Sequence, residues 1–403
     1  MGHIPENDAV QRRIRAMTDR VASARELNYY FYNLPITELH GGSRVVVNGR
    51  EMGMFASYSY LGLVGHPRIN KAAKDAIDKF GTGTHGVRTL AGSLSIHQVL
   101  EDTISEFKKT EAAITFSSGY VTNLTVVSTM VSRGDYVISD KLNHASIVDG
   151  CIMSGAKFIR FRHNDMAALE ERLAQAEPGA SKLVIVDAVF SMDGDIIDLP
   201  RVVELCKKYG AWLMVDEAHS VGVLGKTGRG IEEHFDLPGV IDLKMGTLSK
   251  AIPSVGGYIA GTSELINYLR HTSRAYIFSA ALPPAQAAAA EAAFKVISDE
   301  PWRVDKLREN ATQFIKGLRQ RGFDTMLSQT AIVPVLCGED ETAYIMTRGA
   351  HERKVFVLPV VSPAVPQGLA RLRATVTAAH EPGQIEDAMD ILEEVGRTAR
   401  VLK

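Results

Sequence analysis

The amino-acid sequence predicts an α/β fold, with a large, mainly parallel sheet domain and a smaller α+β domain. In the middle of the chain, short apolar runs alternate with helical segments, as in repeated βαβ units. Several of these runs are apolar throughout instead of alternating with polar residues, which is typical of strands covered on both faces. The 403 residues contain no tandem repeat or long linker, and the length suits about two to three domains.

The N-terminal segment, residues 1–55, is predicted to join the smaller domain. It holds a charged amphipathic helix and then a hairpin, in which Asn48-Gly49 connects Arg44–Val47 to Glu51–Phe55. Asn-Gly is a preferred two-residue turn in such hairpins, because both positions accept a positive φ.

The central segment, residues 56–296, is predicted to form the large domain. Its helices include Met166–Ala176 and Arg201–Tyr209, and its strands are Tyr136–Ser139, Lys157–Phe161, Lys182–Asp187, Trp212–Asp216, Leu243–Gly246 and Tyr258–Ala260. Residues 297–403 follow as a helix, strand, helix, strand and helix, and they complete the smaller domain. The two strands of this last segment are expected at Ile332–Leu336 and Leu372–Thr377.

Charge and composition exclude several classes of protein. Lys and Arg total 45 against 47 Asp and Glu, so a net charge of −2 offers no strong basic field to nucleic acid or an anionic membrane. Hydrophobic residues make up 45% and charged residues 23%, as in a globular protein with a sizeable core. Without an apolar signal segment or a run of about 18 apolar residues, we expect a cytoplasmic protein with no integral membrane segment.

The three cysteines, Cys151, Cys206 and Cys337, are odd in number and widely spaced. This arrangement fits neither a disulfide framework nor a zinc site. We therefore expect small, buried hydrophobic cysteines and no metal centre.

Two short motifs suggest nucleotide binding, and both fail on their context. Residues 81–86 spell G-x-G-x-x-G, but the segment before them, Asn70–Phe80, has helical spacing where the dinucleotide fingerprint needs a strand. Gly225-Lys226-Thr227 resembles the end of a phosphate loop, yet Ser220 occupies the position of its first glycine.

The most informative residue is Lys250, which ends the segment Gly246–Lys250. An isolated lysine is usually a solvated surface charge. This one stands between an apolar strand and the glycine-rich run Ser254–Gly257, which we interpret as a flexible turn. Burial there would lower the lysine pKa and favour Schiff-base chemistry.

A carboxylate and an imidazole precede this lysine by about 30 residues. Strand Trp212–Asp216 ends in Asp216, and His219 follows three residues later. A carboxylate at the end of a strand is where α/β sheets place site residues, although a helix N-cap explains it equally well by itself. With Lys250, it suggests pyridoxal 5′-phosphate, which needs a lysine and a carboxylate on its pyridinium nitrogen.

The same cofactor needs a phosphate site and a partner for its ring. Ser118, Gly119 and Tyr120 precede the helical stretch Val121–Val131, and a helix N-terminus presents free N–H groups to an anion. An ordinary glycine turn is the alternative for this segment. His144 follows the predicted strand Tyr136–Ser139, where a flat imidazole can stack on a pyridine ring or serve as a hydrogen-bonded loop residue.

Together these segments resemble the α-oxoamine synthase family of fold type I pyridoxal-phosphate enzymes, over about residues 40 to 395. The resemblance implies the aminotransferase-like fold of that group. Its most specific pieces occur in the family's order: Tyr60-Leu61-Gly62-Leu63, Gly86-Val87-Arg88 with Gly92 and His97, Asn143–Ser146, Val215–His219, Gly246–Lys250 and Thr377–His380.

The resemblance implies a role for each candidate residue around the cofactor. Lys250 would be the Schiff-base lysine and the base for the α-proton, and Asp216 would pair with the pyridinium nitrogen. His219 and Ser191 would lie near the phenolic oxygen, and His144 would stack on the ring. The phosphate would be held by Ser118, Gly119, Tyr120 and Thr247.

The resemblance also implies how substrate and a second subunit take part. Arg373 matches the arginine that binds the amino acid's carboxylate, for which a bidentate guanidinium is suited. Ser279 and Ala280 would reach the phosphate of the neighbouring subunit, which implies an obligate homodimer with shared sites. One substrate-side residue departs from the family, because Ser59 stands where an asparagine is usual.

The implied reaction is a decarboxylative Claisen-type condensation of a small α-amino acid with an acyl thioester, which gives an α-aminoketone, carbon dioxide and a free thiol. Glycine, alanine and serine stay open as the amino acid, partly because Val361-Ser362-Pro363 replaces an Arg-Pro-Pro run of some members. The thioester is an acyl-CoA or an acyl-carrier protein. An aminotransferase or lyase of the same fold is the alternative, since it would share Lys250 and Asp216.

Overall fold

A computed structural model describes residues 8–402 of the chain. Its centre is a seven-stranded sheet in the order β4-β10-β9-β8-β7-β5-β6. Only β10 runs against its neighbours β4 and β9, and the remaining neighbours in this sheet are parallel. The strands are β4 (Ala112–Phe116), β5 (Tyr136–Asp140), β6 (Lys157–Phe161), β7 (Lys182–Asp187), β8 (Trp212–Asp216), β9 (Leu243–Ser249) and β10 (Pro253–Gly261).

Helices bury both faces of this sheet, which explains its unbroken apolar strands. On β7, Leu183 and Ile185 pack with residues of α4 (Gly119–Met130), α5 (Ala145–Ser154), α9 (Ser263–Thr272) and α10 (Arg274–Ile277). Its alternate residues Val184 and Val186 join the larger core on the opposite face. That core includes α3 (Ser95–Lys108), α6 (Met166–Ala174), α7 (Leu199–Tyr209), α8 (Ile231–Phe235) and α11 (Pro284–Asp299).

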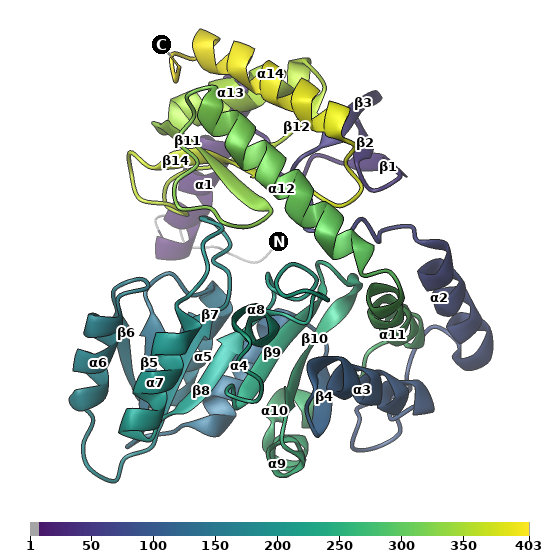
Figure 1. Ribbon diagram of the computed structural model, residues 1–403, viewed down its shortest axis with the longest axis vertical. Coiled ribbons are helices and arrows are strands. Elements are labelled where there is room, and N and C mark those ends of the chain that lie inside the picture. Colours follow the sequence, from purple (N-terminus) through teal and green to yellow (C-terminus); the bar gives the residue numbers. More distant parts are fainter. Residues whose placement is uncertain (1–7, 403) are drawn as a thin grey trace.

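Two smaller sheets lie at the other end of the molecule (Figure 1). One has the order β1-β2-β3-β12 and the other β11-β14-β13. Their strands are β1 (Ile36–His40), β2 (Arg44–Val47), β3 (Arg50–Met54), β11 (Ile332–Gly338), β12 (Val355–Phe356), β13 (Leu358–Val360) and β14 (Ala370–Thr375). The accompanying helices are α12 (Trp302–Gln320), α13 (Asp340–Glu352) and α14 (Pro382–Thr398), while α1 (Ala9–Glu26) and α2 (Pro67–Phe80) belong to the N-terminal part of the chain.

The two ends of the chain meet in the first of these sheets. Strand β3 pairs in parallel with β12, so that Gly53 lies opposite Val355 and Met54 opposite Phe356. We therefore propose residues 1–55 and 297–403 as one domain and 56–296 as the other. The last turn of α11, which ends at Asp299, crosses the second of these boundaries.

All six strands predicted for the large sheet are present, and the hairpin at Asn48-Gly49 joins β2 to β3. Three short strands, β1, β12 and β13, were not predicted, nor was the edge strand β4. One expectation was wrong: Ser254–Gly257 is part of β10 and not a flexible turn. Each glycine there has its own structural reason. Gly256 has a φ of +135°, which residues with a side chain rarely adopt, and Gly257 packs closely against α4.

The cysteines follow the expectation in part. Cys151 and Cys206 are buried, Cys337 is partly buried, and all three are free thiols. Burial raises the pKa of each thiol to about 12. Within residues 8–402, no helix is long and apolar enough to cross a membrane, and no cluster of His, Cys, Asp and Glu is arranged to hold a metal ion.

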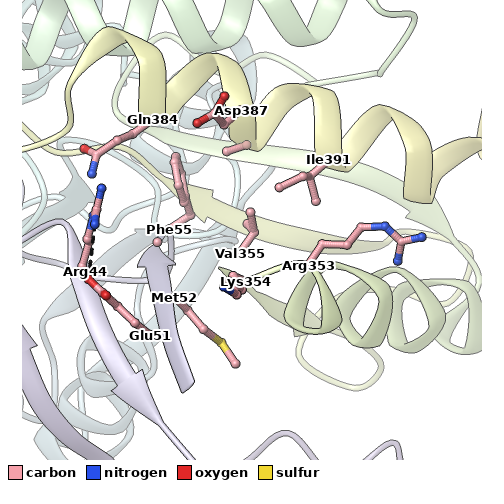
Figure 2. A pocket seen from close by; sticks show the side chains of 12 residues that line it. Arg44, Glu51, Met52, Phe55, Arg353, Lys354, Val355, Gln384, Asp387 and Ile391 are labelled. Atoms are coloured by element: carbon pink, nitrogen blue, oxygen red, sulfur yellow. Dashed lines mark hydrogen bonds and ion pairs between the residues drawn. The ribbon is translucent and has the colours of Figure 1, made fainter. Parts of the chain in front are cut away.

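A hollow of about 300 Å3 opens between β3, β12 and α14 (Figure 2). Phe55, Val355 and Ile391 give it an apolar lining, and Arg44 and Glu51 form an ion pair of 3.3 Å at its edge. None of the candidate site residues is among those that line it.

A partly buried histidine in the loop after β6 connects the end of β5 to the loop after β7. His163 has Nδ1 3.1 Å from an Asp140 carboxylate oxygen and Nε2 2.9 Å from one of Asp195, and its ring packs edge-on against Phe190. Burial would lower the pKa of His163, but the hydrogen bonds to Asp140 and Asp195 outweigh it and raise the pKa to about 10. The protonated ring therefore places one positive charge between two carboxylates and offsets part of their repulsion.

Replacing this ring predicts a pH-dependent loss of stability. The folded pKa of about 10 lies above the ordinary value of 6.5, so the stabilisation is complete below pH 6.5 and is lost as the pH rises through 10. We expect His163→Gln to lower the free energy of unfolding by about 2 kcal/mol at low pH. The difference from wild type should shrink towards pH 10.

Urea unfolding at a series of pH values measures this difference. Lys71→Gln is the matched control, because it removes the exposed ion pair with Asp75 and should change little. A His163→Gln deficit that is equal at low and high pH would contradict the assigned charge.

Candidate active site

The carboxyl ends of the parallel strands bring the candidate residues together. Asp187 ends β7, Asp216 ends β8, and Lys250 follows directly after β9. Asp187 and Asp216 are neighbours in the sheet register. They border a cavity of about 260 Å3 whose lining is Ser118, Gly119, Tyr120, Asn123, His144, Ser146, Asp187, Val189, Asp216, Ala218, His219, Met245, Thr247, Ser249 and Lys250.

Asp216 is a buried carboxylate with a fixed orientation. One oxygen accepts a hydrogen bond from the Ala218 N–H at 2.9 Å, and the other accepts one from the Asn123 side-chain amide at 2.7 Å. The same amide nitrogen donates to the Ser146 hydroxyl at 2.9 Å. Helix α4 thus holds the strand-end carboxylate in place.

Lys250 is a half-buried amine beside a buried imidazole. Its Nζ lies 2.8 Å from Nε2 of His219. Burial lowers the pKa of Lys250 to about 8, against the opposing effect of Asp216 and Asp187. Roughly a tenth of the amine is therefore neutral and nucleophilic at pH 7, and the fraction rises steeply above that pH.

His219 is neutral, because burial and the nearby Lys250 and Arg373 lower its pKa well below the ordinary value. Its second ring nitrogen, Nδ1, lies 2.6 Å from the hydroxyl of Tyr60. Tyr60 is fully buried in the loop between β3 and α2.

His144 is the N-cap residue of α5 and lines the cavity. Its backbone N–H donates to Asp187 at 3.2 Å, and its Nδ1 accepts from the Ser146 N–H at 3.2 Å. This capping orients the ring from a rigid helix terminus.

Asp187 is a site residue that the sequence reasoning missed. Its side chain is buried, and one carboxylate oxygen has no hydrogen-bond partner. Burial, with Asp216 alongside, raises the pKa of Asp187 well above the ordinary value. The available signal was its position as the last residue of an apolar strand, which is the same signal that identified Asp216.

The N-terminus of α4 also lines this cavity, through Ser118, Gly119 and Tyr120. Ser118 caps it by accepting a hydrogen bond from the Val121 N–H at 3.2 Å, while the first N–H groups of a helix have no partner within it. The Thr247 hydroxyl is near, since a Cβ added to Gly119 would lie 3.0 Å from it. Ser118, Gly119, Tyr120 and Thr247 therefore share one anion-binding arrangement.

Glycine in β10 makes this close approach possible. A Cβ added to Gly257 would lie 2.7 Å from the Gly119 Cα and 2.4 Å from the Thr122 hydroxyl. Any side chain at position 257 would thus push α4 away from the sheet.

A second cavity, of about 430 Å3, also borders Lys250. Tyr58 and Ser59 line it together with Ser249 and Lys250. Ser59 is buried, and its hydroxyl has no hydrogen-bond partner.

Arg373 reaches this region from β14. Its Nε donates to the Ser191 carbonyl at 2.6 Å and its Nη1 to the Thr375 hydroxyl at 3.0 Å, while Nη2 is buried without a partner. The guanidinium also lies 4.7 Å from the centre of the Tyr58 ring. An anchored arginine with one unused nitrogen is suited to receive a carboxylate.

Three of the residues predicted to bind the cofactor are not among those that line the first cavity. Ser191 contributes its carbonyl to Arg373, and no role of its side chain follows from these contacts. Ser279 and Ala280 follow α10, where Ala280 forms a bridge with Val87. Their expected contact with a neighbouring subunit stays a prediction.

The residues of the first cavity fit pyridoxal 5′-phosphate. The cavity combines a nucleophilic lysine, an oriented carboxylate at the end of β8 and an anion site at the start of α4. Two buried polar atoms of its lining, Asn123 Oδ1 and Asp187 Oδ1, also lack hydrogen-bond partners. Such atoms are costly unless a ligand or water satisfies them.

Comparisons with known proteins agree with this geometry. The family model for aminotransferase class I and II matches residues 51–392. An 8-amino-7-oxononanoate synthase of Thermoanaerobacter pseudethanolicus is 45% identical over 92% of this chain and 94% of its own, and that of Geobacter sulfurreducens is 45% identical over 88% and 92%. A serine palmitoyltransferase structure from S. paucimobilis with bound PLP has a TM-score of 0.95 at 33% identity, covering 98% of this chain and 100% of its own.

Adding a side chain at Gly257 in β10 should weaken the anion site at the start of α4. We expect Gly257→Ala to raise the dissociation constant for pyridoxal 5′-phosphate about tenfold, because the added Cβ displaces Gly119. Titration of the cofactor-free protein, followed by absorbance, measures this constant. Gly383→Ala is the control, since a Cβ there meets nothing within 4 Å. Equal affinity in the two variants would contradict the assigned phosphate site.

Proposed function

This chain belongs to the α-oxoamine synthases, within the aminotransferase class I and II family, and on that basis we propose that it condenses glycine, alanine or serine with an acyl thioester. The products are an α-aminoketone, carbon dioxide and a free thiol. The observation that carries the proposal is the Lys250 amine, held 2.8 Å from His219 between two cavities. The product named for one group of relatives, 8-amino-7-oxononanoate, is itself an α-aminoketone.

Pyridoxal 5′-phosphate, when bound, supplies an aldehyde that links to an amine and a ring that accepts the electron pair released at the amino acid's α-carbon. Asp216 would hold the protonated ring nitrogen from the end of β8. Ser118, Gly119, Tyr120 and Thr247 would hold the phosphate at the start of α4, and His144 would cover the ring.

The same residues handle the protons of the reaction. A neutral Lys250 amine can link to the cofactor and, once displaced by the substrate amine, take the α-proton of the amino acid. His219 would donate a hydrogen bond to the cofactor's phenolic oxygen, since its neighbours keep it uncharged. Ser191 is proposed near the same oxygen.

The amino acid and the thioester would approach Lys250 from the second cavity. Arg373 would bind the carboxylate with its unused Nη2 and so fix the α-carbon in front of Lys250. The unpartnered hydroxyl of Ser59 supplies a small polar contact there, in place of a longer amide side chain. The larger volume on that side, about 430 Å3, suits the acyl thioester.

We also propose a homodimer with shared sites. Ser279 lies beside Phe278, whose large apolar side chain is 72% exposed, and Leu90, near the bridge between Val87 and Ala280, is 83% exposed. Apolar surface of this kind favours burial against a second copy. Ser279 and Ala280 would then reach the partner's phosphate.

An aminotransferase or lyase of the same fold would use Lys250 and Asp216 but release a keto acid or an amine. The acyl thioester separates the two functions. We expect thiol release only when one of glycine, alanine or serine is present together with the thioester, in amounts equal to the carbon dioxide formed. A keto acid or amine formed without thioester would overturn the proposal in favour of the alternative.

Removing the amine should abolish the link to the cofactor. We expect Lys250→Ala to lose the visible absorption of lysine-linked cofactor and at least about a thousandfold in turnover, since the group that carries the proton is gone. In the wild type, the rate of cofactor capture should rise with pH through a midpoint of about 8, as the amine loses its proton. Lys141→Ala is the control, because Lys141 is exposed on the surface. Near-normal turnover by Lys250→Ala would contradict the assignment of Lys250 as the cofactor-linked lysine.

A further inference from the structure

We propose that Tyr60 is a positioning residue that determines which ring nitrogen of His219 carries the proton. By donating to Nδ1, Tyr60 keeps the N–H on Nε2, where it points at Lys250. The side chain of Tyr60 thus acts through His219 and without touching the lysine.

The three side chains form a continuous chain of contacts. The Tyr60 hydroxyl lies 2.6 Å from Nδ1 of His219, and Nε2 on the other side of the ring lies 2.8 Å from Nζ of Lys250. Tyr60 is 0% exposed and His219 is 6% exposed, so bulk water does not compete for these contacts. Buried hydrogen bonds of this kind are costly to leave unmade.

Once Lys250 has lost its proton, above a pH of about 8, the protonation states leave one arrangement of hydrogens. Burial raises the pKa of Tyr60 to about 12, even with Arg373 alongside, so the hydroxyl keeps its proton. The pKa of His219 lies well below its ordinary value, so the ring carries a single N–H. The neutral His219 ring thus has one N–H that can donate and one nitrogen lone pair that can accept. Its two neighbours are the phenol of Tyr60 and the amine of Lys250.

Arg373 decides the direction of the first hydrogen bond. The guanidinium stands beside the Tyr60 hydroxyl, lowers its pKa, and has no acceptor atom, so it cannot take the phenolic proton. Nδ1 of His219, 2.6 Å from the hydroxyl oxygen, is placed to accept a hydrogen bond from it. Tyr60 therefore donates to Nδ1, and the ring proton must reside on Nε2.

The resulting donor faces the reactive amine. Nε2–H donates to Nζ when Lys250 is neutral, and the same N–H is available to the phenolic oxygen of the cofactor. The hydrogen bond to the cofactor rests on the proposed function, whereas the tautomer of His219 follows from the contacts among Tyr60, His219 and Lys250 alone. Arg373, which would bind the substrate carboxylate, is connected to Lys250 through Tyr60 and His219.

A purely structural role for Tyr60 is the competing explanation, and a second buried tyrosine tests it. Tyr258 is also 0% exposed, in β10, and its hydroxyl has no hydrogen-bond partner. Tyr60→Phe and Tyr258→Phe each remove one buried hydroxyl and keep the ring. Only the first change removes a donor from His219.

The first experiment reads the tautomer in the cofactor-free wild type at about pH 9, where the Lys250 amine is mostly neutral and can accept a hydrogen bond. Nitrogen-15 NMR of labelled histidine, assigned by His219→Gln, distinguishes a protonated Nε2 from a protonated Nδ1. We expect a protonated Nε2, and a protonated Nδ1 would overturn the proposal. This result does not depend on cofactor binding or on the reaction.

The second experiment follows the visible absorption of the lysine-linked cofactor against pH. We expect Tyr60→Phe to raise the apparent pKa of the lysine-linked cofactor by up to about one unit. Without the Tyr60 hydroxyl, His219 donates less of the time to the cofactor's phenolic oxygen, so that oxygen shares a proton more tightly. Tyr258→Phe should titrate like the wild type. Equal titrations of Tyr60→Phe and wild type would overturn the proposal.

A double-mutant comparison separates action through His219 from any other route. In the His219→Gln background, adding Tyr60→Phe should give no further shift, since the residue through which it acts is gone. Fully additive shifts would overturn the proposal. A wild type that forms no lysine-linked cofactor would contradict the proposed function instead, and the NMR result would still decide the role of Tyr60.

Discussion

The burial of one lysine amine against two strand-end carboxylates is the constraint on which this structure depends. Burial alone would make the Lys250 ammonium unfavourable, and Asp216 with Asp187 partly restores it. The balance places the pKa at about 8, where the amine is both accessible as a nucleophile and able to hold a proton. This balance of burial and charge requires β7, β8 and β9 to be adjacent and parallel, because only then do the residues at their carboxyl ends lie close together.

The smaller sheets add the substrate side of this arrangement. Arg373 comes from β14, yet its Nε is held by the carbonyl of Ser191, which belongs to the loop after β7. The neighbouring Arg371 forms a 2.7 Å ion pair with Asp193 in the same loop. Movement of one part of the molecule against the other would therefore change the distance between the carboxylate site and Lys250, and these contacts oppose it.

Much of this organisation is readable from local sequence. The apolar strand that ends in Asp216 was predicted with its correct end, and its last residue was identified as a site residue. The apolar strand before Lys250 was also predicted, but it continues to Ser249, beyond its predicted end at Gly246. The edge strand Ala112–Phe116 was missed because its short run carries two alanines and a threonine. Ser254–Gly257 was misinterpreted because glycine marks both flexible turns and close backbone packing, and only the neighbouring Gly119 distinguishes the two.

The sequence by itself determined the fold class, the lysine, the strand-end carboxylate and the helix that begins at the anion site, since each depends on neighbours along the chain. The tertiary structure alone decided that Asp187 lies next to Asp216, that Arg373 is anchored with one nitrogen unused, and that Tyr60 meets His219. Tyr60 and His219 are 159 positions apart. Their hydrogen bond requires the packing of distant loops, which burial and sheet order impose and local residue patterns do not encode.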